Sequence, residues 1–194
     1  LLCEHVEAAE SQLPEGYTPL EYIQSTGQQH INTEVIPSEK AIFETEVDIP
    51  DAKVSDDRMI FGAWCTDGRQ CRVGYNRANG KTVFYRANTG ASVSTAFPAA
   101  GRKTKVRVEG KTVTLSTAGE TVLSYTLNTE NAVTACRQPM YLFGLNNGGD
   151  GVSGNPSMLG SFRMYSFKVW DKVGTSNDLT MTGDFVPCSN GSAY

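Results

Sequence analysis

The stretch TKVRVEGKTVTLSTAGETVLSYTL, Thr104 to Leu127, decides the fold class of this chain. Apolar and polar residues alternate along it, which is the pattern of strands that bury one face, and Gly110 and Gly119 interrupt the alternation as turn residues do. A two-residue turn at 109–110 and a three-residue loop at 118–120 keep one face apolar, with the opposed pairs Val106–Val113, Leu115–Leu123 and Val113–Tyr125. We therefore predict three consecutive antiparallel strands.

A second hairpin is predicted over Cys71 to Arg86, CRVGYNRANGKTVFYR. A two-residue turn at 79–80 opposes Tyr75 to Phe84, whereas a three-residue loop at 78–80 opposes Tyr75 to Val83. The three-residue loop gathers four apolar side chains on one face, those of Val73, Tyr75, Val83 and Tyr85. We favour this register, which places Asn76, Phe84 and Arg86 on the other face.

The rest of the chain consists of short apolar runs between turn residues, the spacing of an all-β sandwich. Further strands are predicted over 20–25, 30–35, 42–49, 58–64, 140–145 and 161–170. In the last of these, alternation puts Phe162 and Met164 on one face and Phe167 and Val169 on the other, so both faces are partly apolar.

Residues 1–13 are interpreted as a lead-in or linker, with a short helix as an alternative, because Pro14 and Gly16 break any longer helix. Residues 14–194 are then predicted to form a single domain, since sandwiches of about 200 residues are commonly one unit.

The composition is typical of a loop-rich globular protein. With 39% hydrophobic residues and a formal net charge of −4, the chain is too apolar for disorder and lacks the basic balance of a nucleic-acid-binding protein. No apolar run reaches the roughly 20 residues that span a bilayer, so no membrane insertion is expected. Neither histidine has a partner at metal or triad spacing, and no glycine-rich phosphate loop opens a helix, so zinc and nucleotide chemistry are not expected.

Four segments carry a family resemblance. They are LPEGYTPLEYIQSTGQQHINT at 13–33, VRVEGKTVTLSTAGETV at 106–122, and the closing pair GSFRMYSFKVWD at 160–171 and DFVPC at 184–188. Together they resemble the concanavalin A-like and laminin-G-like domains of gut-bacterial surface proteins and phage tail-associated proteins. The resemblance implies a two-sheet antiparallel jelly roll with adjacent termini. That fold carries lectins, adhesion modules, assembly proteins and glycosidases, so the resemblance leaves the function open.

Glu44, Glu46 and Asp48 are the strongest catalytic candidates, because they occupy alternate positions of FETEVDI and a strand projects them from one face. Laminarinase-like glycosidases, which share the fold that the resemblance implies, use clustered acids on one strand as nucleophile and general acid. The match is loose, since the run ends in aspartate and lies in an early strand. We expect a solvated outer face, with catalysis as the weaker alternative.

Sugar recognition requires an aromatic platform beside planar polar side chains, because the C–H faces pack on rings while the hydroxyls form hydrogen bonds. The favoured hairpin register supplies Asn76, Phe84 and Arg86, and Trp64 lies in the preceding strand. We predict these four residues as ligand-binding, with burial in the core as the alternative.

A second candidate is the oxygen-rich loop NNGGDGVSGN at 146–155. Asn146, Asn147 and Asp150 are predicted to bind a glycan, and Asp150 is a weak candidate for Ca²⁺. No other metal and no cofactor is expected. A plain turn-rich connection is the alternative.

The chain has five cysteines, so at least one thiol is free. Cys65 and Cys71 flank the turn-like sequence TDGRQ, and we predict that they form a disulfide in an oxidising compartment. Cys136 and Cys188 are expected to be small buried residues.

These observations favour a non-catalytic carbohydrate-binding or adhesion module of an extracellular or cell-surface protein, with a glycan or a surface protein as its partner. The second hypothesis is a structural or attachment domain of a phage tail or surface assembly, which would place the chain in a virion. A laminarinase-like glycosidase is the third.

Overall fold

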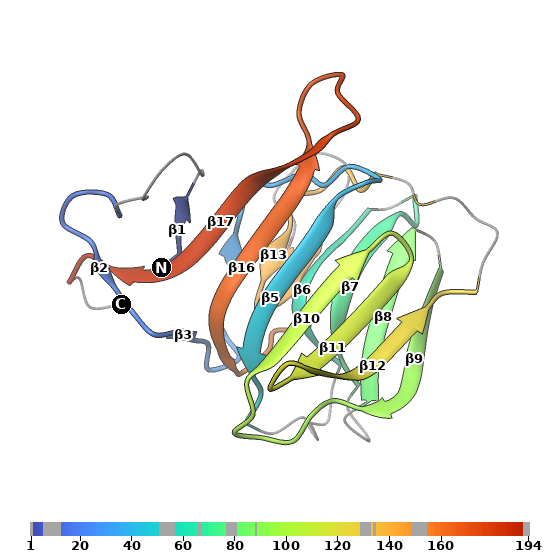
Figure 1. The fold of residues 1–194 in the computed structure, drawn as a ribbon, viewed down its shortest axis with the longest axis horizontal. Coiled ribbons are helices and arrows are strands. Elements are labelled where there is room, and N and C mark those ends of the chain that lie inside the picture. The colour runs from blue at the N-terminus through green and yellow to red at the C-terminus, as the bar shows by residue number, and fades with distance from the viewer. Residues whose placement is uncertain are drawn as a thin grey trace.

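The alternation in the sequence builds two sheets that bury their apolar faces against each other. A computed structural model describes residues 2–5, 13–50, 57–65, 67–76, 81–87, 89–128, 133, 135–148 and 155–191. Within these ranges every regular element is a strand, and there is no helix of the length and apolarity that a membrane span requires. The predicted fold class, a two-sheet antiparallel sandwich of the jelly-roll kind, is confirmed (Figure 1).

The first sheet lies in front in Figure 1 and contains nine of the described strands. In spatial order they are β1 (Leu2–His5), β17 (Leu179–Ser189), β16 (Arg163–Lys172), β5 (Ile42–Asp48), β10 (Thr104–Glu109), β11 (Thr112–Thr117) and β12 (Glu120–Thr126). Two short strands join its edges, β2 (Thr18–Pro19) on β17 and β3 (Ile23–Gln24) on β16. We call this the nine-stranded sheet.

The second sheet, behind the first, contains eight described strands. They are β15 (Asn155–Ser157), β14 (Leu145–Asn147), β6 (Arg58–Trp64), β7 (Gln70–Tyr75), β8 (Lys81–Ala87) and β9 (Thr89–Ala96), with β13 (Tyr141–Leu142) on β6 and β4 (Ile31–Asn32) on β13. All described pairings are antiparallel except that of β14 with β6. We call this the eight-stranded sheet.

Aromatic side chains join the two sheets in the core. Phe61 of β6 contacts Phe43 of β5 and Phe167 of β16, with ring centroids 5.5 Å and 5.4 Å away, and all three are 0% exposed. Such tilted and edge contacts add to the stabilisation from burying apolar area. The polar residues on the other side of β5, β10 and β11 therefore face outward.

The β10–β11 turn differs from the predicted one. Val106 lies opposite Leu115 and Val108 opposite Val113, so the turn consists of Gly110 and Lys111. The predicted pairing was wrong by two residues, a shift that keeps every side chain on its face. The pairs Leu115–Leu123 and Val113–Tyr125 are confirmed, although a bulge after Leu115 replaces the predicted three-residue loop.

The β7–β8 hairpin contradicts the favoured register. Tyr75 lies opposite Thr82 and Val73 opposite Phe84, so the connecting segment is longer than either loop considered. This one-residue difference from the favoured register turns β8 over: Phe84 faces the core, whereas Tyr85 faces outward.

Both ends of the described chain meet at one edge of the nine-stranded sheet. β1 pairs with β17, where Leu2 lies opposite Pro187 and His5 opposite Asp184 (Figure 1). Residues 2–5 are therefore a strand and not part of a helix, because pairing with β17 provides partners for their backbone groups. Residues 6–12 lie outside the described ranges.

Candidate functional site

The outer face of the nine-stranded sheet carries a strip of polar side chains along β5, β10 and β11. One row across the strands contains Glu44, Arg107 and Thr114, and the next contains Glu46, Lys105 and Ser116. We call this surface the outer strip: Glu44, Glu46, Lys103, Lys105, Arg107, Glu109, Thr112, Thr114 and Ser116. It faces outward because the intervening residues of the same strands fill the core.

Ion pairs hold the middle of the outer strip in place. The Glu44 carboxylate accepts hydrogen bonds from Lys105 Nζ at 3.1 Å and from Arg107 Nη1 at 3.3 Å. Arg107 also pairs with Glu109, with 3.1 Å between Nη2 and Oε2. Both oxygens of Glu44 are therefore engaged, so neither is placed to deliver a proton to a substrate.

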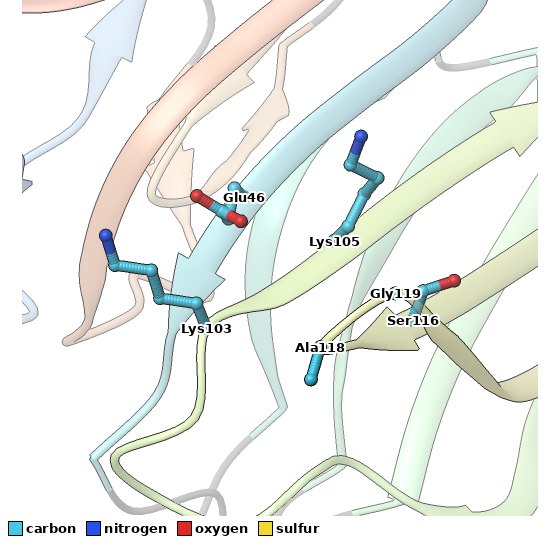
Figure 2. Close-up of a pocket in the computed structure, with 6 residues that line it drawn as sticks. All are labelled: Glu46, Lys103, Lys105, Ser116, Ala118 and Gly119. Carbon is cyan, nitrogen blue, oxygen red and sulfur yellow. The ribbon is translucent and has the colours of Figure 1, made fainter.

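One end of the outer strip is hollowed, as Figure 2 shows. Glu46, Lys103 and Lys105 line this hollow together with Ser116 and the turn at 118–119, around a volume of about 360 Å³. The Glu46 carboxylate points between the two lysine side chains (Figure 2). In the part of the chain described, Glu46 has neither a hydrogen-bond nor an ion-pair partner, which leaves its oxygens open to a ligand.

A second hollow lies at the opposite end of the same strands. It has a volume of about 380 Å³ and is lined by Arg107, Glu109, Thr112 and Thr114. The Arg107 guanidinium lies 5.6 Å from the ring centroid of Trp170 on β16, which is half-buried. We call this the Trp170 hollow.

A second aromatic residue of β16 marks the other end of the strip. Tyr165 lies beneath Lys103, whose Nζ is 3.9 Å from the ring centroid. The outer strip is thus bordered on the β16 side by Trp170 and Tyr165. Rings beside hydroxyl, carboxylate and guanidinium groups are the components that bind a sugar, because its hydroxyls donate and accept while its C–H faces pack on the rings.

The acids predicted as catalytic alternatives do share one face, as their alternation requires. Glu44 and Glu46 belong to the outer strip, but Asp48 is 8% exposed and accepts a hydrogen bond from the Gly101 amide at 2.9 Å. Asp48 therefore holds the 98–101 turn against β5 and is not available to a substrate.

Two of the predicted ligand residues lie in the core. Phe84 is 0% exposed and Arg86 is 1% exposed. The Arg86 guanidinium donates to the carbonyls of Ser38, Glu39 and Ala41, each at 3.3 Å. Assigning these two residues to a ligand surface was wrong, because the register of β8 turns them inward.

Asn76 and Trp64 are separated from each other and from the outer strip. Asn76 donates to Asp57 Oδ1 at 2.7 Å beside the β7–β8 connection. Trp64 lies on the outer face of the eight-stranded sheet, where the Arg72 guanidinium sits 5.0 Å from its ring and 4.0 Å from the Tyr85 ring. Burial lowers the pKa of Arg72 from its ordinary value. Trp64 and Trp170 thus mark opposite sides of the sandwich.

The predicted residues of the 146–155 loop are only partly described. Asn146 is 0% exposed and donates to the Pro139 carbonyl at 2.9 Å, so it supports the chain instead of facing a ligand. Asn147 is exposed at the end of β14, and Asp150 lies outside the described ranges. The described residues contain no group of three or more His, Cys, Asp and Glu side chains that would hold a metal ion.

The predicted Cys65–Cys71 disulfide is absent, and both cysteines are free. The Cys65 amide donates to the Arg69 carbonyl at 2.8 Å, whereas Cys71 lies opposite Ala63, so the two cysteines are diagonal neighbours. Diagonal Cα atoms are about 7–8 Å apart, at or beyond the limit for a disulfide. Cys188 is buried as expected, but it is disulfide-bonded.

The sequence reasoning did not find Arg107, Thr112, Thr114 and Trp170 as site residues. Their signal was present, since they occupy the polar positions of the strands that decide the fold and of the closing segment. It is a weak signal, because the solvated side of any sheet alternates in the same way. Only the strand order, which places β5 between β16 and β10, assembles them.

No family model matches the chain, and no curated protein matches it by sequence. Among solved structures, a heptameric SAP-like pentraxin from Limulus polyphemus is 10% identical, with a TM-score of 0.48 over 82% of this chain and 77% of that one. Domains LG4-5 of the mouse laminin alpha1 chain are 11% identical, with a TM-score of 0.47 over 94% of this chain and 51% of that one. A fructosyltransferase from A. japonicus is 12% identical, with a TM-score of 0.45 over 81% of this chain.

This chain spans 26% of the length of that fructosyltransferase and about half of the laminin chain. At these identities and TM-scores the comparisons assign no family and no activity. The function must therefore be inferred from the surface residues of the chain itself.

Proposed function

We propose that this chain is a non-catalytic carbohydrate-binding or adhesion module and that it binds its ligand on the outer strip. One observation carries the proposal: a half-buried Trp170 stands beside a hollow lined by Arg107, Glu109, Thr112 and Thr114. This arrangement supplies an aromatic ring and hydrogen-bonding groups of both kinds within one surface.

The charges of the strip support a glycan ligand. Lys103, Lys105 and Arg107 supply donors, and Glu46 and Glu109 supply acceptors. A ligand with many hydroxyls matches such a mixture, because each hydroxyl can donate to a carboxylate and accept from a cation. An apolar ligand would remove these charged groups from water without offering them hydrogen bonds, which is costly.

The shape of the strip supports weak and extended binding. The two hollows are shallow and lie along the same pair of strands, β10 and β11. A shallow surface buries little of its ligand, so we expect modest affinity for one sugar residue and a gain with longer chains.

The disulfide at Cys188 supports an extracellular or cell-surface location, because such bonds persist in oxidising compartments. The glycan or adhesion partner would then be met outside the cell.

The experiment uses the two tryptophans of the chain as a matched pair. Binding is first measured on an array of neutral and acidic glycans, with and without Ca²⁺, and the strongest glycan is then titrated by calorimetry. Trp170→Ala is expected to weaken binding by at least about tenfold, since tryptophans often carry interface energy, and Trp170→Phe is expected to retain most of it.

Trp64→Ala, on the opposite face, is the control and is expected to bind as the unmodified chain does. Equal loss in Trp64→Ala and Trp170→Ala would contradict the outer strip as the site. Absence of binding to every glycan on the array would contradict the carbohydrate ligand itself.

A further inference from the structure

Two buried thiols lie in contact where β6 ends. Cys65 Sγ and Cys136 Sγ are 3.0 Å apart, although 71 positions separate them along the chain. Their side chains are 1% and 2% exposed, and the Arg137 amide donates to Cys65 Sγ at 3.1 Å. A disulfide bond is about 2.0 Å long, so the two sulfurs need to approach by only about 1 Å to bond.

A third buried thiol nearby, Cys71, is less suitably placed. It is 0% exposed, and its strand position is diagonal to that of Cys65. The sulfur that Cys65 contacts is that of Cys136. The packing therefore selects one pair among Cys65, Cys71 and Cys136, the cysteines that are free in the described part of the chain.

We propose that Cys65 and Cys136 are joined by a disulfide when the chain folds in the presence of a small-molecule disulfide oxidant such as oxidised glutathione. The thiolate of one cysteine attacks the oxidant, forms a mixed disulfide and releases one reduced glutathione. The thiolate of the second cysteine then attacks the protein sulfur of that mixed disulfide and releases the other. Two protein thiols are oxidised, one glutathione disulfide is reduced to two thiols, and the two protons pass to the departing thiolates.

The timing of the reaction follows from burial. Removal from water raises the pKa of the Cys136 thiol, so the folded chain offers little of the thiolate that reacts. Exchange is therefore expected during folding, before the segment at 135–140 closes over the end of β6. Once formed, the buried disulfide is protected from reductants for the same reason.

The bond would fasten the segment before β13 to the turn that follows β6. Cys136 Sγ lies 3.9 Å from the Arg69 carbonyl, and the Cys65 carbonyl accepts from the Gly68 amide at 3.0 Å. The link thus closes a long loop, and long loops restrict the unfolded chain most in the chain-entropy account of disulfide stabilisation. Cys71 remains the free thiol.

The test is peptide mapping of the full chain refolded from the reduced, denatured state in a glutathione redox buffer. Free thiols are alkylated under denaturing conditions, and the chain is digested without reductant. We expect one peptide pair joined through Cys65 and Cys136, with Cys71 alkylated. Alkylation of both Cys65 and Cys136, or a peptide pair joined through Cys65 and Cys71, would overturn the proposal.

Two variants serve as matched controls, because both replace a buried thiol with alanine. Cys71→Ala is expected to keep the link, and Cys136→Ala is expected to lose it and leave Cys65 open to alkylation. The oxidised Cys136→Ala chain should melt roughly 5–10 °C below oxidised Cys71→Ala. Equal melting temperatures and equal alkylation of Cys65 in the two variants would contradict the link, and the map of the unmodified chain decides the matter if a variant fails to fold.

Discussion

Arg86 is a fully buried guanidinium that ties the chain before β5 to β8. It donates to three carbonyls between Ser38 and Ala41 and lies 5.6 Å from the ring centroid of Phe43. Arg86→Ala removes these bonds and leaves a cavity, so the free energy of unfolding is expected to fall by about 3 kcal/mol or more. Urea unfolding measures the change.

Arg102 provides the control for this prediction because it is exposed. Arg102→Ala is expected to change the free energy of unfolding by no more than about 0.5 kcal/mol. Similar losses in the two variants would show that Arg86 does not support the core as described.

His30 is expected to make stability depend on pH near neutrality. Its ring lies 4.6 Å from that of Tyr141, and burial lowers the pKa of His30 from its ordinary 6.5. The unfolded chain therefore binds this proton more readily, and stability is expected to fall as the pH drops through 6.5 towards the lowered pKa. Above 6.5 this contribution is fully present.

The measurement is the urea midpoint between about pH 7.5 and about pH 5, with His30→Gln as the comparison. We expect the urea midpoint to change less with pH in His30→Gln than in the unmodified chain. The hydrogen bond from Lys172 is the chief cause of a lowered pKa at Glu39. Protonation of Glu39 therefore affects stability only below this pH range and does not contribute to the measured slope. A slope of the opposite sign, or one unchanged in His30→Gln, would be inconsistent with this account.

Sequence reasoning succeeded where a residue's neighbours lie on the same or the next strand. Glu44 and Glu46 face outward as their alternation predicts. It failed for Arg86, because a charged residue is normally found at the surface. The burial of Arg86 is explained by its hydrogen bonds to carbonyls before β5, which are more than forty positions away in the sequence. The contact of Cys65 with Cys136 could not be predicted for the same reason, because 71 positions separate the two residues.

Among the strands, β16 shows how one bulge changes which side chains face the core. The register shifts between Met164 and Ser166, so that Met164 lies opposite Val47 and Ser166 opposite Glu46. The bulge lets Phe162, Met164, Phe167 and Val169 all enter the core, although strict alternation predicted that they divide between two faces. In β16, the apolar residues at both alternating sets of positions are explained by this bulge.

The β7–β8 hairpin shows the limit of choosing a register by apolar count. The favoured loop collected four apolar residues on one face, yet β8 turns Val83 and Tyr85 outward, where they pack with Met59 and Leu145. The rejected turn at 79–80 grouped Tyr75 with Phe84 and so gave the correct faces, although its pairing differs by two residues. Counting apolar residues could not take account of the second apolar cluster, that of Met59, Val83 and Leu145, on the other side of this sheet.

The position of a strand in its sheet is expected to set its hydrogen-exchange rate. β5 is bonded on both sides, to β10 and β16, whereas β11 is the only described strand that pairs with β12, which is mostly exposed. Peptides covering 42–48 should exchange at least about tenfold more slowly than peptides covering 120–126. Mass spectrometry after timed labelling measures this, and equal uptake in the two strands would contradict the strand order.

In the whole molecule, the two tryptophans lie on opposite sides of the sandwich. Trp64 lies on the outside of the eight-stranded sheet and Trp170 on the outside of the nine-stranded sheet, with the core between them. The fold class follows from local alternation, which the sequence displays. The candidate site depends on strand order, which non-adjacent segments determine and which no local pattern encodes.

The whole chain is expected to bind glycans without hydrolysing them. Glycoside hydrolysis usually requires two carboxyl groups about 5 Å or about 6.5–9.5 Å apart across the scissile bond, one of them holding a proton. Glu44 has both oxygens engaged by Lys105 and Arg107, and Asp48 is held by the Gly101 amide. Of the three acids on β5, only Glu46 is open, and one carboxylate cannot serve as both acid and base in the same step.

Incubation with β-glucans, mucin glycans and other polysaccharides should therefore release no reducing ends above a buffer blank over a day. Calorimetry on the same preparation serves as the control, because it shows that a chain that releases no sugar still binds its glycan. Glu46→Gln is the decisive variant, because it replaces the open carboxylate of β5 with an isosteric amide. Sugar release by the unmodified chain that Glu46→Gln abolishes would assign hydrolysis to this face and replace the binding module with a glycosidase.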